Sequence, residues 1–459
     1  MINISSKINL SLPGKRKIIQ ILQASLDAAD PKLAVLNSIK RNGDVIFAGE
    51  KRYDLNTYKN VFLIGAGKAA FEMSQGVMEI LGDKISSGYL IVKYLPEEQG
   101  ITSSSIVRVV EGSHPQPDNK SIESTKQLIR IASQADQDDL VIFLLSGGAS
   151  ALMTSPRKGI ELPDLQELTR MMLSCGAEIQ EINIVRKHLD DVKGGGLARL
   201  FDPSEVLSLI LSDVVASPLD AIGSGPTAAD QSTFHDAYEI LKKYDLTEKT
   251  PANILTVLQD GINGQIKETI KDGDPILGKL NNILIGSNEK SVEAGQIRAA
   301  ALGFECRIIT TSLKGEARKV GSELGKLLRE TSMNTKKPVC LIAGGETTVT
   351  LIGKGKGGRN LELTLAAVEE IAGLKDAALI SLATDGDDGP TGAAGAIVTG
   401  DSLLKANRAG MNPRLFLDNN DSFPFFDKLN DLIVTGATGT NVNDLVFLFA
   451  NLSSLENHE

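Results

Sequence analysis

The 459-residue chain has no tryptophan, few other aromatic residues and only three cysteines. An aromatic content of 4% argues against a stacking surface for nucleic acid. The cysteines are odd in number, widely spaced and in no metal-binding pattern, which predicts small buried residues in a reducing compartment. The longest apolar run, LVIFLLSGGASALM at 140–153, is too short and interrupted to span a bilayer, and the N-terminus lacks an apolar signal-peptide core. We therefore expect a cytoplasmic protein that binds neither membranes nor nucleic acid.

Positive charge is also scarce, because 48 lysines and arginines face 58 aspartates and glutamates, for a net charge of −10. Such a chain binds an anion only where cations are concentrated locally. The cations that stand beside glycine-rich or helix-forming segments are therefore informative: Lys68, Arg186, Lys187, Lys193 and the cluster Lys354, Lys356 and Arg359.

Short apolar, β-branched runs repeatedly give way to glycine and then to a helical pattern, as in 60–81, 140–153, 281–303 and 338–345. Continuous rather than alternating apolarity is typical of strands buried on both faces, hence of parallel strands covered by helices. The fold class is α/β. Length alone favours two domains. The polar, glycine- and proline-containing segment 260–279 separates a first domain, 1–265, from a second, 280–459.

Glycine-rich turns follow the expected strands, and in open α/β sheets ligands bind at the carboxyl ends of strands. GAGKAA at 65–70 fits a GxGxxA dinucleotide turn, but the acid that would hold a ribose is replaced by Lys93 at the end of the next strand, and no GxxxxGK[ST] occurs. Lys68 stands at a helix N-terminus, where the helix dipole favours an acid. This placement favours an anion-binding lysine over a solvated one.

The turn SGGAS at 146–150 resembles a nucleophile elbow in outline, but GxSxG is absent. A cradle of hydroxyls and amides for a carboxylate or phosphate is the favoured interpretation, formed by Ser146, Gly147, Gly148 and Ser150. In GSHPQPD at 112–118, His114 is either a ligand contact or a turn-packing residue.

Segment 181–200 has a helical pattern that ends at Gly194–Gly196. Arg186 and Lys193 are seven residues apart, which places both on one helix face and aims them at one ligand. A solvated charged face is the alternative.

Acids also follow two expected strands. Asp213 comes after the run at 206–211, and Asp385 comes after ALISL. Carboxylates beside phosphate oxygens suit Mg²⁺. Asp387 is better explained by an Asp-Gly turn.

The segment GGETTVTLIGKGKGGRN at 344–360 places Glu346 and a β-branched run, which favours a strand, before a cationic glycine loop that contains Arg359. Open backbone N–H groups and a guanidinium suit phosphate. Together with the other motifs this loop indicates phosphoryl transfer, which needs positioning and charge neutralisation more than covalent chemistry.

Eight motifs in order resemble the glycerate 2-kinase family with a MOFRL-type C-terminal domain, some members of which carry hydroxypyruvate reductase labels. They are GAGKAA, GSHPQPD, SGGASAL, VRKHLDDVKGG, LSDVV…IGSGPT, GGETTVTLIGKGKGGRN, TDGDDGPTGAAG and VTGATGTNVNDL, and they cover about residues 17 to 450. The resemblance implies a Rossmann-like N-terminal domain with a parallel sheet, a second α/β (MOFRL) domain and an active site in the cleft between them. It also implies transfer of the γ-phosphoryl group of ATP to the 2-hydroxyl of D-glycerate with Mg²⁺, giving 2-phosphoglycerate and ADP.

The family's catalytic lysine in GxGK and arginine in GGRN match Lys68 and Arg359. The remaining candidates bind nucleotide, substrate or metal: His114, Ser146, Gly147, Gly148, Ser150, Arg186, Lys193 and Glu346 for ligand, and Asp213 and Asp385 for metal or for orienting the hydroxyl.

The chain departs from the family's pattern at two places. Ala216 and Ser217 replace the glycine and acid of SDVxGD, and Leu361 replaces the glutamine of GGRNQE. Two other functions stay open at this point: an NAD(P)H-dependent hydroxypyruvate reductase, and a non-catalytic protein that binds phosphorylated metabolites.

Overall fold

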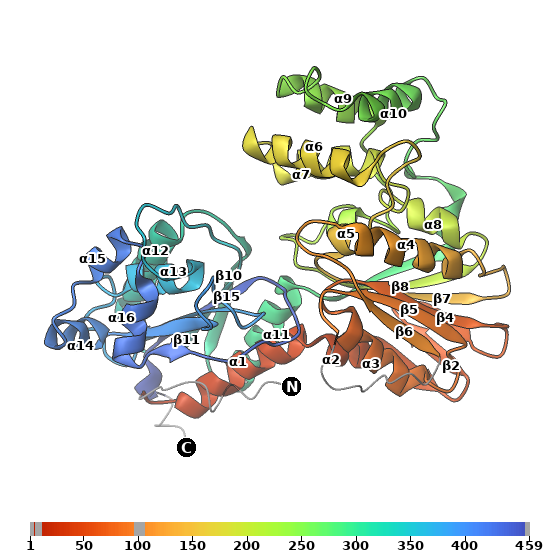
Figure 1. Cartoon of the computed structure of the whole chain (residues 1–459). Coiled ribbons are helices and arrows are strands. Elements are labelled where there is room, and N and C mark those ends of the chain that lie inside the picture. Colours follow the sequence, from red (N-terminus) through yellow and green to blue (C-terminus); the bar gives the residue numbers. More distant parts are fainter. Residues whose placement is uncertain (1–3, 5–11, 96–105, 455–459) are drawn as a thin grey trace. The chain divides into compact units, whose positions relative to one another are not determined.

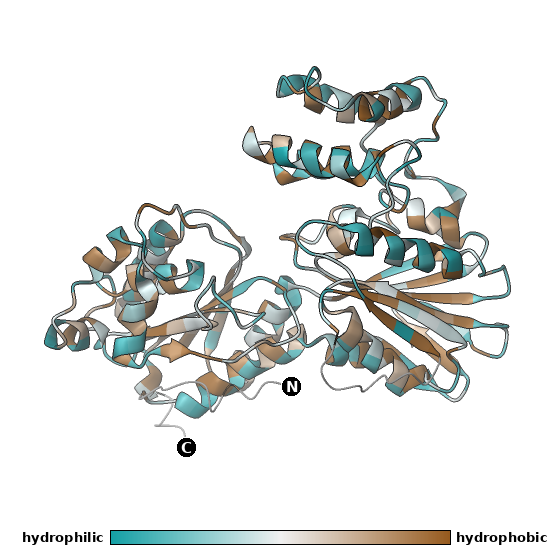
Figure 2. Cartoon of the chain, viewed as in Figure 1, coloured by the Kyte–Doolittle hydropathy of each residue, from teal (hydrophilic) through white to brown (hydrophobic). Residues whose placement is uncertain are grey.

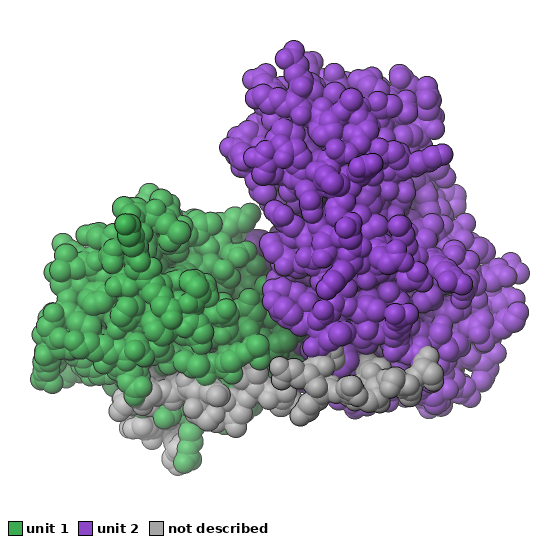
Figure 3. Space-filling view, in the orientation of Figure 1, with its two compact units in different colours: residues 1–30, 286–459 green, residues 31–285 purple. Residues whose placement is uncertain are grey.

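The computed structural model describes Ile4, residues 12–95 and residues 106–454 (Figure 1). The chain forms two compact units: unit 1 contains residues 1–30 and 286–459, and unit 2 contains residues 31–285 (Figure 3). Each unit is a sheet covered by helices, so the α/β class is confirmed.

This division differs from the expected one in two segments. Helix α1 (Lys15–Ala29) belongs to unit 1, because Ile18, Ile21 and Leu22 are buried in a core of that unit. Strand β9 (Leu280–Gly286) is an edge strand in the sheet of unit 2. Apolar periodicity shows that a helix or strand has a face to bury, but not which sheet buries it.

The sheet of unit 2 has the order β6-β5-β4-β7-β8-β9, and the registered pairs from β6 to β8 are parallel. The strands are β4 (Val61–Ala66), β5 (Ser87–Val92), β6 (Val107–Glu111), β7 (Leu140–Leu145) and β8 (Glu205–Leu211). Every residue of β4 and β7 is buried, as continuous apolarity predicts, and Figure 2 shows the strands as largely hydrophobic.

Helices cover both faces of this sheet. Figure 1 shows α2 (Pro31–Ser38) and α3 (Ala70–Leu81) on one face, and α4 (Asn119–Ala132), α5 (Ala149–Leu152) and α8 (Gly196–Phe201) on the other. The chain runs from β4 outward to β5 and β6, then returns to β7 and β8 on the other side of β4. The strand order therefore reverses between β4 and β7, and such a switch point is where open α/β sheets bind ligands.

Unit 2 has two further parts that the sequence did not predict. Strands β1 (Ile39–Asn42), β2 (Val45–Ala48) and β3 (Lys51–Asp54) form an antiparallel sheet. Helices α6 (Leu162–Ser174), α7 (Ile179–His188), α9 (Phe234–Lys243) and α10 (Ala252–Ile262) share a separate apolar core. Short 3₁₀ turns lie at η2 (Ile222–Ser224) and η3 (Pro275–Lys279).

The expected single helix over 181–200 is wrong. Helix α7 ends at His188, and α8 begins at Gly196. Between them the Asp190 carboxylate accepts a hydrogen bond from the Val192 N–H (3.0 Å), and Gly194 and Gly195 have φ angles of 54° and 78°. Glycine with a positive φ commonly caps the C-terminus of a helix. Here, however, the glycine pair lies several residues after the end of α7 and directly before α8.

The sheet of unit 1 has the order β10-β11-β15-β12-β13-β14; β10 and β11 are parallel and the other neighbours antiparallel. The strands are β10 (Glu305–Leu313), β11 (Val339–Gly345), β12 (Ala378–Ala383), β13 (Gly395–Thr399), β14 (Leu432–Ile433) and β15 (Asp444–Ala450), and the helices besides α1 are α11 (Asn288–Ala301), α12 (Ala317–Asn334), α13 (Arg359–Ala367), α14 (Ser402–Arg408), α15 (Pro413–Asp418) and α16 (Ser422–Leu429). Cys340 and Ile342 of β11 share a core with α1, while Leu341 and Ala343 share one with α12 and α13. Alternation along β11 therefore buries both faces of the sheet.

The strand expected in the β-branched run after Glu346 is also wrong. Thr348 makes one isolated bridge to Glu316, and the rest of 346–358 is a loop. No helix within the described part of the chain is long and apolar enough to cross a membrane.

Candidate functional site

In unit 2 the predicted glycine turns meet at the switch point between β4 and β7. The turn after β4 contains Gly67 and Lys68, and the turn after β7 contains Ser146, Gly147 and Gly148. The Lys68 N–H donates to the Gly147 carbonyl oxygen (2.9 Å), and the Ala69 N–H donates to the buried Ser146 Oγ (3.0 Å). The two turns therefore form one bonded unit, here called the Lys68 cradle (residues 67–69 and 146–148).

Glycine is required in the cradle because side chains lie directly over its backbone. A Cβ at Gly147 would be 2.0 Å from the Asp213 Oδ2. A Cβ at Gly148, whose φ is 85°, would be 3.1 Å from the His114 Cδ2 and 3.2 Å from the Lys68 Cγ. Five predicted residues, which follow the ends of β4, β6, β7 and β8, thus lie close together: Lys68, His114, Gly147, Gly148 and Asp213.

The Lys68 side chain is half-buried, and its ammonium forms no hydrogen bond or ion pair with any described residue. An ammonium group that is held beside open backbone without a carboxylate is available to an anion. Lys68 directly precedes the first turn of α3, as the sequence predicted.

His114 is half-buried in the same cradle and also has no hydrogen-bond partner among the described residues. Burial, with help from the charges of Lys68 and Lys93, lowers the pKa of His114 from 6.5 to about 4. The imidazole is therefore neutral at neutral pH and can accept or donate one hydrogen bond to a ligand.

A cavity of about 250 Å³, here called the first cavity, opens beside the cradle. Six of the predicted site residues line it: His114, Gly148, Ser150, Arg186, Lys193 and Asp213. The Ser150 and Ser224 hydroxyls lie 2.7 Å apart at its wall.

Arg186 and Lys193 differ in whether a carboxylate already pairs with them. Arg186 makes no hydrogen bond or ion pair with a described residue, and burial lowers its pKa. Lys193 is 3% exposed, and its Nζ lies 2.6 Å from the Asp190 Oδ2 and 3.1 Å from the Met153 carbonyl oxygen. Arg186 is therefore the cation that the first cavity offers to an anion, while Lys193 is already paired.

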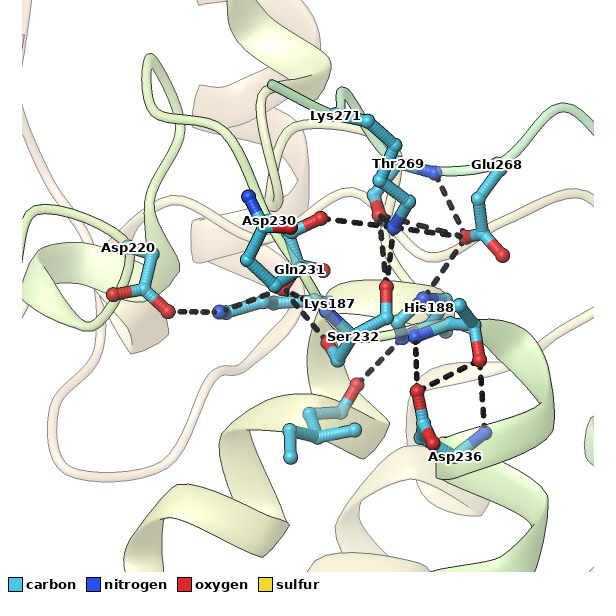
Figure 4. Close-up of polar contacts among 12 residues, drawn as sticks. Lys187, His188, Asp220, Asp230, Gln231, Ser232, Asp236, Glu268, Thr269 and Lys271 are labelled. Carbon is cyan, nitrogen blue, oxygen red and sulfur yellow. Dashed lines mark hydrogen bonds and ion pairs between the residues drawn. The ribbon is translucent and has the colours of Figure 1, made fainter.

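A buried polar network holds the helix that carries Arg186 (Figure 4). On α7, the Lys187 Nζ contacts Asp220 (3.0 Å) and Asp230 (3.1 Å), and the His188 Nε2 lies 3.0 Å from the Glu268 carboxylate. Asp220 directly precedes Ala221, which lines the first cavity. The network thus fixes α7 against the loop after β8.

Several lining residues were not predicted. Asp190, Asn183 and Gln166 line the first cavity. Asn183 stands three residues before Arg186 in α7, so helical spacing alone could have placed it on the same face. Asp190 lies in the motif VRKHLDDVKGG, in which only the cations were considered, whereas Gln166 carries no comparable signal.

In unit 1 the predicted arginine lies where β11 ends and β15 begins. Arg359 opens α13, and its Nε and Nη2 bind the two carboxylate oxygens of Asp444 at 2.5 and 2.9 Å. Its Nη1 lies 3.4 Å from Glu346, which follows β11. Burial alone would lower the pKa of Arg359, but the hydrogen bonds and charge of Asp444 outweigh it and raise the pKa. The guanidinium is therefore fixed and charged, with one edge left partly exposed.

The start of α13 is held by a different acid. The carboxylate of Asp388 accepts hydrogen bonds from the Asn360 N–H (3.0 Å) and the Leu361 N–H (2.8 Å), and Asp388 is fully buried. This carboxylate satisfies the helix N-terminus. Leu361, one of the departures from the family pattern, is buried in the apolar core of α12 and α13.

Unit 1 has an opening of its own, of about 470 Å³, beside Arg359. It is lined by Arg359, Gly389 and residues of the loop 346–358 that include Gly357 and Gly358. Side chains of 419–421 hold that loop. The Asn420 Oδ1 accepts hydrogen bonds from the N–H groups of Ile352 (2.7 Å) and Gly353 (2.9 Å), and the Asp421 Oδ1 accepts one from Lys356 (2.8 Å). These bonds replace the strand pairing that the β-branched run predicted.

Asp385 follows β12 in unit 1 and is half-buried, and its Oδ1 accepts a hydrogen bond from the Asp387 N–H (3.2 Å). No cluster of three metal-binding side chains occurs among the described residues. Mg²⁺ commonly uses one or two carboxylates and completes its shell with phosphate and water, so Asp213 beside the cradle fits such an ion.

The other departure from the family pattern lies in the loop after β8. Ala216 and Ser217 have φ angles of 64° and 48°. This is the left-handed region, in which glycine is at ease and alanine is strained. The backbone therefore keeps a shape that suits glycine at Ala216.

Comparisons with known proteins identify the family of the chain. The profile of a domain of unknown function, DUF4147, matches residues 17–259, and that of the MOFRL family matches residues 339–444. A glycerate 2-kinase of Pyrococcus horikoshii is 40% identical over 93% of this chain and 95% of its own length. A D-glycerate 2-kinase of Thermotoga maritima is 39% identical over 94% of this chain and 97% of its own length. The crystal structure of a glycerate kinase from Thermotoga maritima matches with a TM-score of 0.84 and 37% identity over 95% of this chain and 99% of that one. The chain therefore belongs to the glycerate 2-kinase family with a MOFRL-type C-terminal part.

Proposed function

We infer that the protein is a glycerate 2-kinase, which transfers the γ-phosphoryl group of ATP to the 2-hydroxyl of D-glycerate and releases 2-phosphoglycerate and ADP. The single observation that carries the phosphoryl chemistry is the Lys68 cradle, in which an unpaired ammonium lies beside glycine backbone at the switch point of a parallel sheet. The relatives named above support the substrate.

Lys68 and Arg359 are the proposed catalytic residues. In the transfer, the oxygen at C2 forms a bond to the γ-phosphorus, the bond from that phosphorus to the β,γ-bridging oxygen breaks, and the hydroxyl proton is lost. Negative charge is spread over the phosphoryl oxygens and grows on the leaving ADP. The Lys68 ammonium has no partner among the described residues, and the Arg359 guanidinium is held in place by Asp444, so each is proposed to supply positive charge to the phosphoryl oxygens.

The other cradle residues position the ligands. Arg186 binds a carboxylate or phosphate in the first cavity, and neutral His114 donates one hydrogen bond there. Ser146 acts by holding the two cradle turns together, because its buried hydroxyl accepts the Ala69 N–H. Ser150 and Glu346 stay proposed ligand contacts, while Lys193 supports the wall through Asp190.

Asp213 and Asp385 are the acids proposed to hold Mg²⁺, which when bound would neutralise phosphate charge. The Asp213 carboxylate lies over the Gly147 backbone of the cradle, and it is also the group proposed to orient the substrate hydroxyl or to accept its proton. A cytoplasmic location belongs to the same proposal, since Cys175, Cys306 and Cys340 are free thiols and free thiols suit a reducing compartment.

The test is to incubate the protein with ATP, Mg²⁺ and D-glycerate and to identify the products by phosphorus NMR. We expect 2-phosphoglycerate and ADP. A parallel sample with hydroxypyruvate and NADH tests the reductase: consumption of NADH without any phosphoglycerate would overturn the proposal.

Lys68→Ala tests the catalytic assignment. We expect kcat to fall roughly 10²- to 10³-fold, about 3 to 4 kcal/mol, by analogy with the loss of one oxyanion donor. Lys59→Ala is the matched control, because Lys59 is an exposed lysine of the same unit with no side-chain partner. An increase in KM with unchanged kcat would show that Lys68 binds substrate and transition state equally.

A further inference from the structure

A second cavity in unit 2 has no part in the proposed reaction. It has a volume of about 360 Å³ and lies among α4, the segment after α5, and α8. Its lining shares a single residue, Lys193, with that of the first cavity. The turn 190–196 therefore separates two openings.

Cations dominate the lining of the second cavity. Arg157, Arg199, Lys267 and Lys193 line it, against one acid, Asp191. Lys193 is neutralised by Asp190, which leaves two guanidinium groups and one ammonium. This concentration is unusual in a chain of net charge −10.

The two guanidinium groups lack hydrogen-bond partners. The Nε atoms of Arg157 and Arg199 are both buried and unpartnered, and neither guanidinium donates a hydrogen bond to a described residue. Arg157 lies 3.9 Å from the half-exposed Asp191 carboxylate and 5.2 Å from the Phe234 ring. Burial lowers the pKa of each arginine, because removing a guanidinium from water disfavours its charged form.

The half-buried acid Glu268, whose charge acts on both arginines, cannot serve as their partner. The Glu268 oxygens contact the His188 ring (3.0 Å), the Thr269 N–H (2.9 Å) and the Phe234 N–H (3.1 Å). Burial alone would raise the pKa of Glu268, but these hydrogen bonds outweigh it and lower the pKa to about 2. Glu268 is thus ionised and committed to the polar network of Figure 4.

We propose that the second cavity binds a small phosphorylated metabolite, with its phosphate held by Arg157 and Arg199. Guanidinium groups bind phosphate through paired, charge-assisted hydrogen bonds, and a dianion would satisfy the donors that the protein leaves open. Lys267 and the Ser155 hydroxyl lie in the same lining and add donors. The volume exceeds what one free phosphate needs, so the ligand has a body beyond its phosphate.

The test uses the full chain and labelled inorganic phosphate in equilibrium dialysis. Arg186→Gln provides the background, because it removes the open cation of the first cavity. In that background, Arg157→Gln combined with Arg199→Gln should weaken phosphate binding at least tenfold, because both guanidinium groups and their charge-assisted hydrogen bonds are lost. The matched control is Lys158→Gln, which removes an exposed neighbouring cation that does not line the cavity and should leave the affinity unchanged.

Equal phosphate affinity in the double variant and the control would overturn the proposal. Glycerol phosphate should displace the labelled phosphate at lower concentrations than unlabelled phosphate does, and failure to displace it would overturn the assignment to a metabolite.

A second measurement needs no substitution. Phosphate should slow the modification of Arg157 and Arg199 by phenylglyoxal, as followed by mass spectrometry, without slowing that of Arg108, an exposed arginine that pairs with no described residue. Equal rates at Arg157 and Arg199 with and without phosphate would also overturn the proposal.

Discussion

Replacing Gly147 by alanine should displace the carboxylate of Asp213 while leaving the fold intact. Gly147 does not have a positive φ, so its backbone accepts alanine. The new Cβ would lie 2.0 Å from the Asp213 Oδ2 and 2.5 Å from its Cγ, where real contacts are longer than 3.0 Å. The carboxylate must therefore move by roughly 1 Å, and a misplacement of that size in an active site can lower the rate about 10²-fold. This corresponds to about 2.7 kcal/mol in the activation free energy.

The assay is the rate of 2-phosphoglycerate formation, with thermal unfolding measured in parallel. Gly278→Ala is the matched control, because Gly278 has an ordinary φ and a Cβ there meets nothing within 4 Å. If the effect passes through Asp213, the double variant Gly147→Ala/Asp213→Asn should be no slower than Asp213→Asn alone. A Gly147→Ala enzyme as active as the Gly278→Ala control would refute the reasoning.

Three further perturbations test other parts of unit 2. Lys187→Met should destabilise the protein by about 3 to 5 kcal/mol in urea unfolding, because it leaves the buried carboxylate of Asp230 without its cation, and adding Asp230→Leu should recover part of the loss. Ala216→Gly should raise stability by about 0.5 to 1 kcal/mol, since it relieves a left-handed alanine that is exposed and loses no packing; unchanged or lower stability would contradict this reasoning. The unfolded chain takes up the proton of His114 near pH 6.5 and the folded chain only near pH 4, so stability should fall as the pH falls between these values. In guanidinium unfolding, the free energy of unfolding should decrease less from pH 7 to pH 5 for His114→Gln than for the wild type.

Much of the cradle was predictable because glycine and continuous apolarity carry local information. The continuous apolar runs before Gly65 and Ser146 are typical of strands buried on both faces, and the carboxyl ends of such parallel strands meet at one edge of the sheet. The sequence thus placed Lys68, the Ser146 turn and Asp213 near one another. It did not place His114 there, because a single histidine before proline has two plausible environments.

Pairing between distant side chains was not predictable. The partner of Arg359 is Asp444, 85 residues later, and the two meet only because β15 is the antiparallel neighbour of β11. Lys193 was expected beside Arg186 on one helix, yet the chain turns at Asp190, whose carboxylate binds Lys193. In both cases an acid that lies in a quoted motif, but to which the sequence assigned no role, decides whether a cation is open to a ligand.

The loop 346–358 shows why composition and conformation can point in opposite directions. Its threonines and Ile352 favour a strand, but a strand needs a neighbour for its N–H groups, and β11 already pairs with β10 and β15. Asn420 and Asp421 bind the N–H groups of Ile352, Gly353 and Lys356 instead. Because those bonds end in side chains rather than in a sheet, the loop can approach Arg359 at the start of α13 and line the opening beside it. The absence of a strand in 346–358 is thus what allows this loop to line the opening beside Arg359.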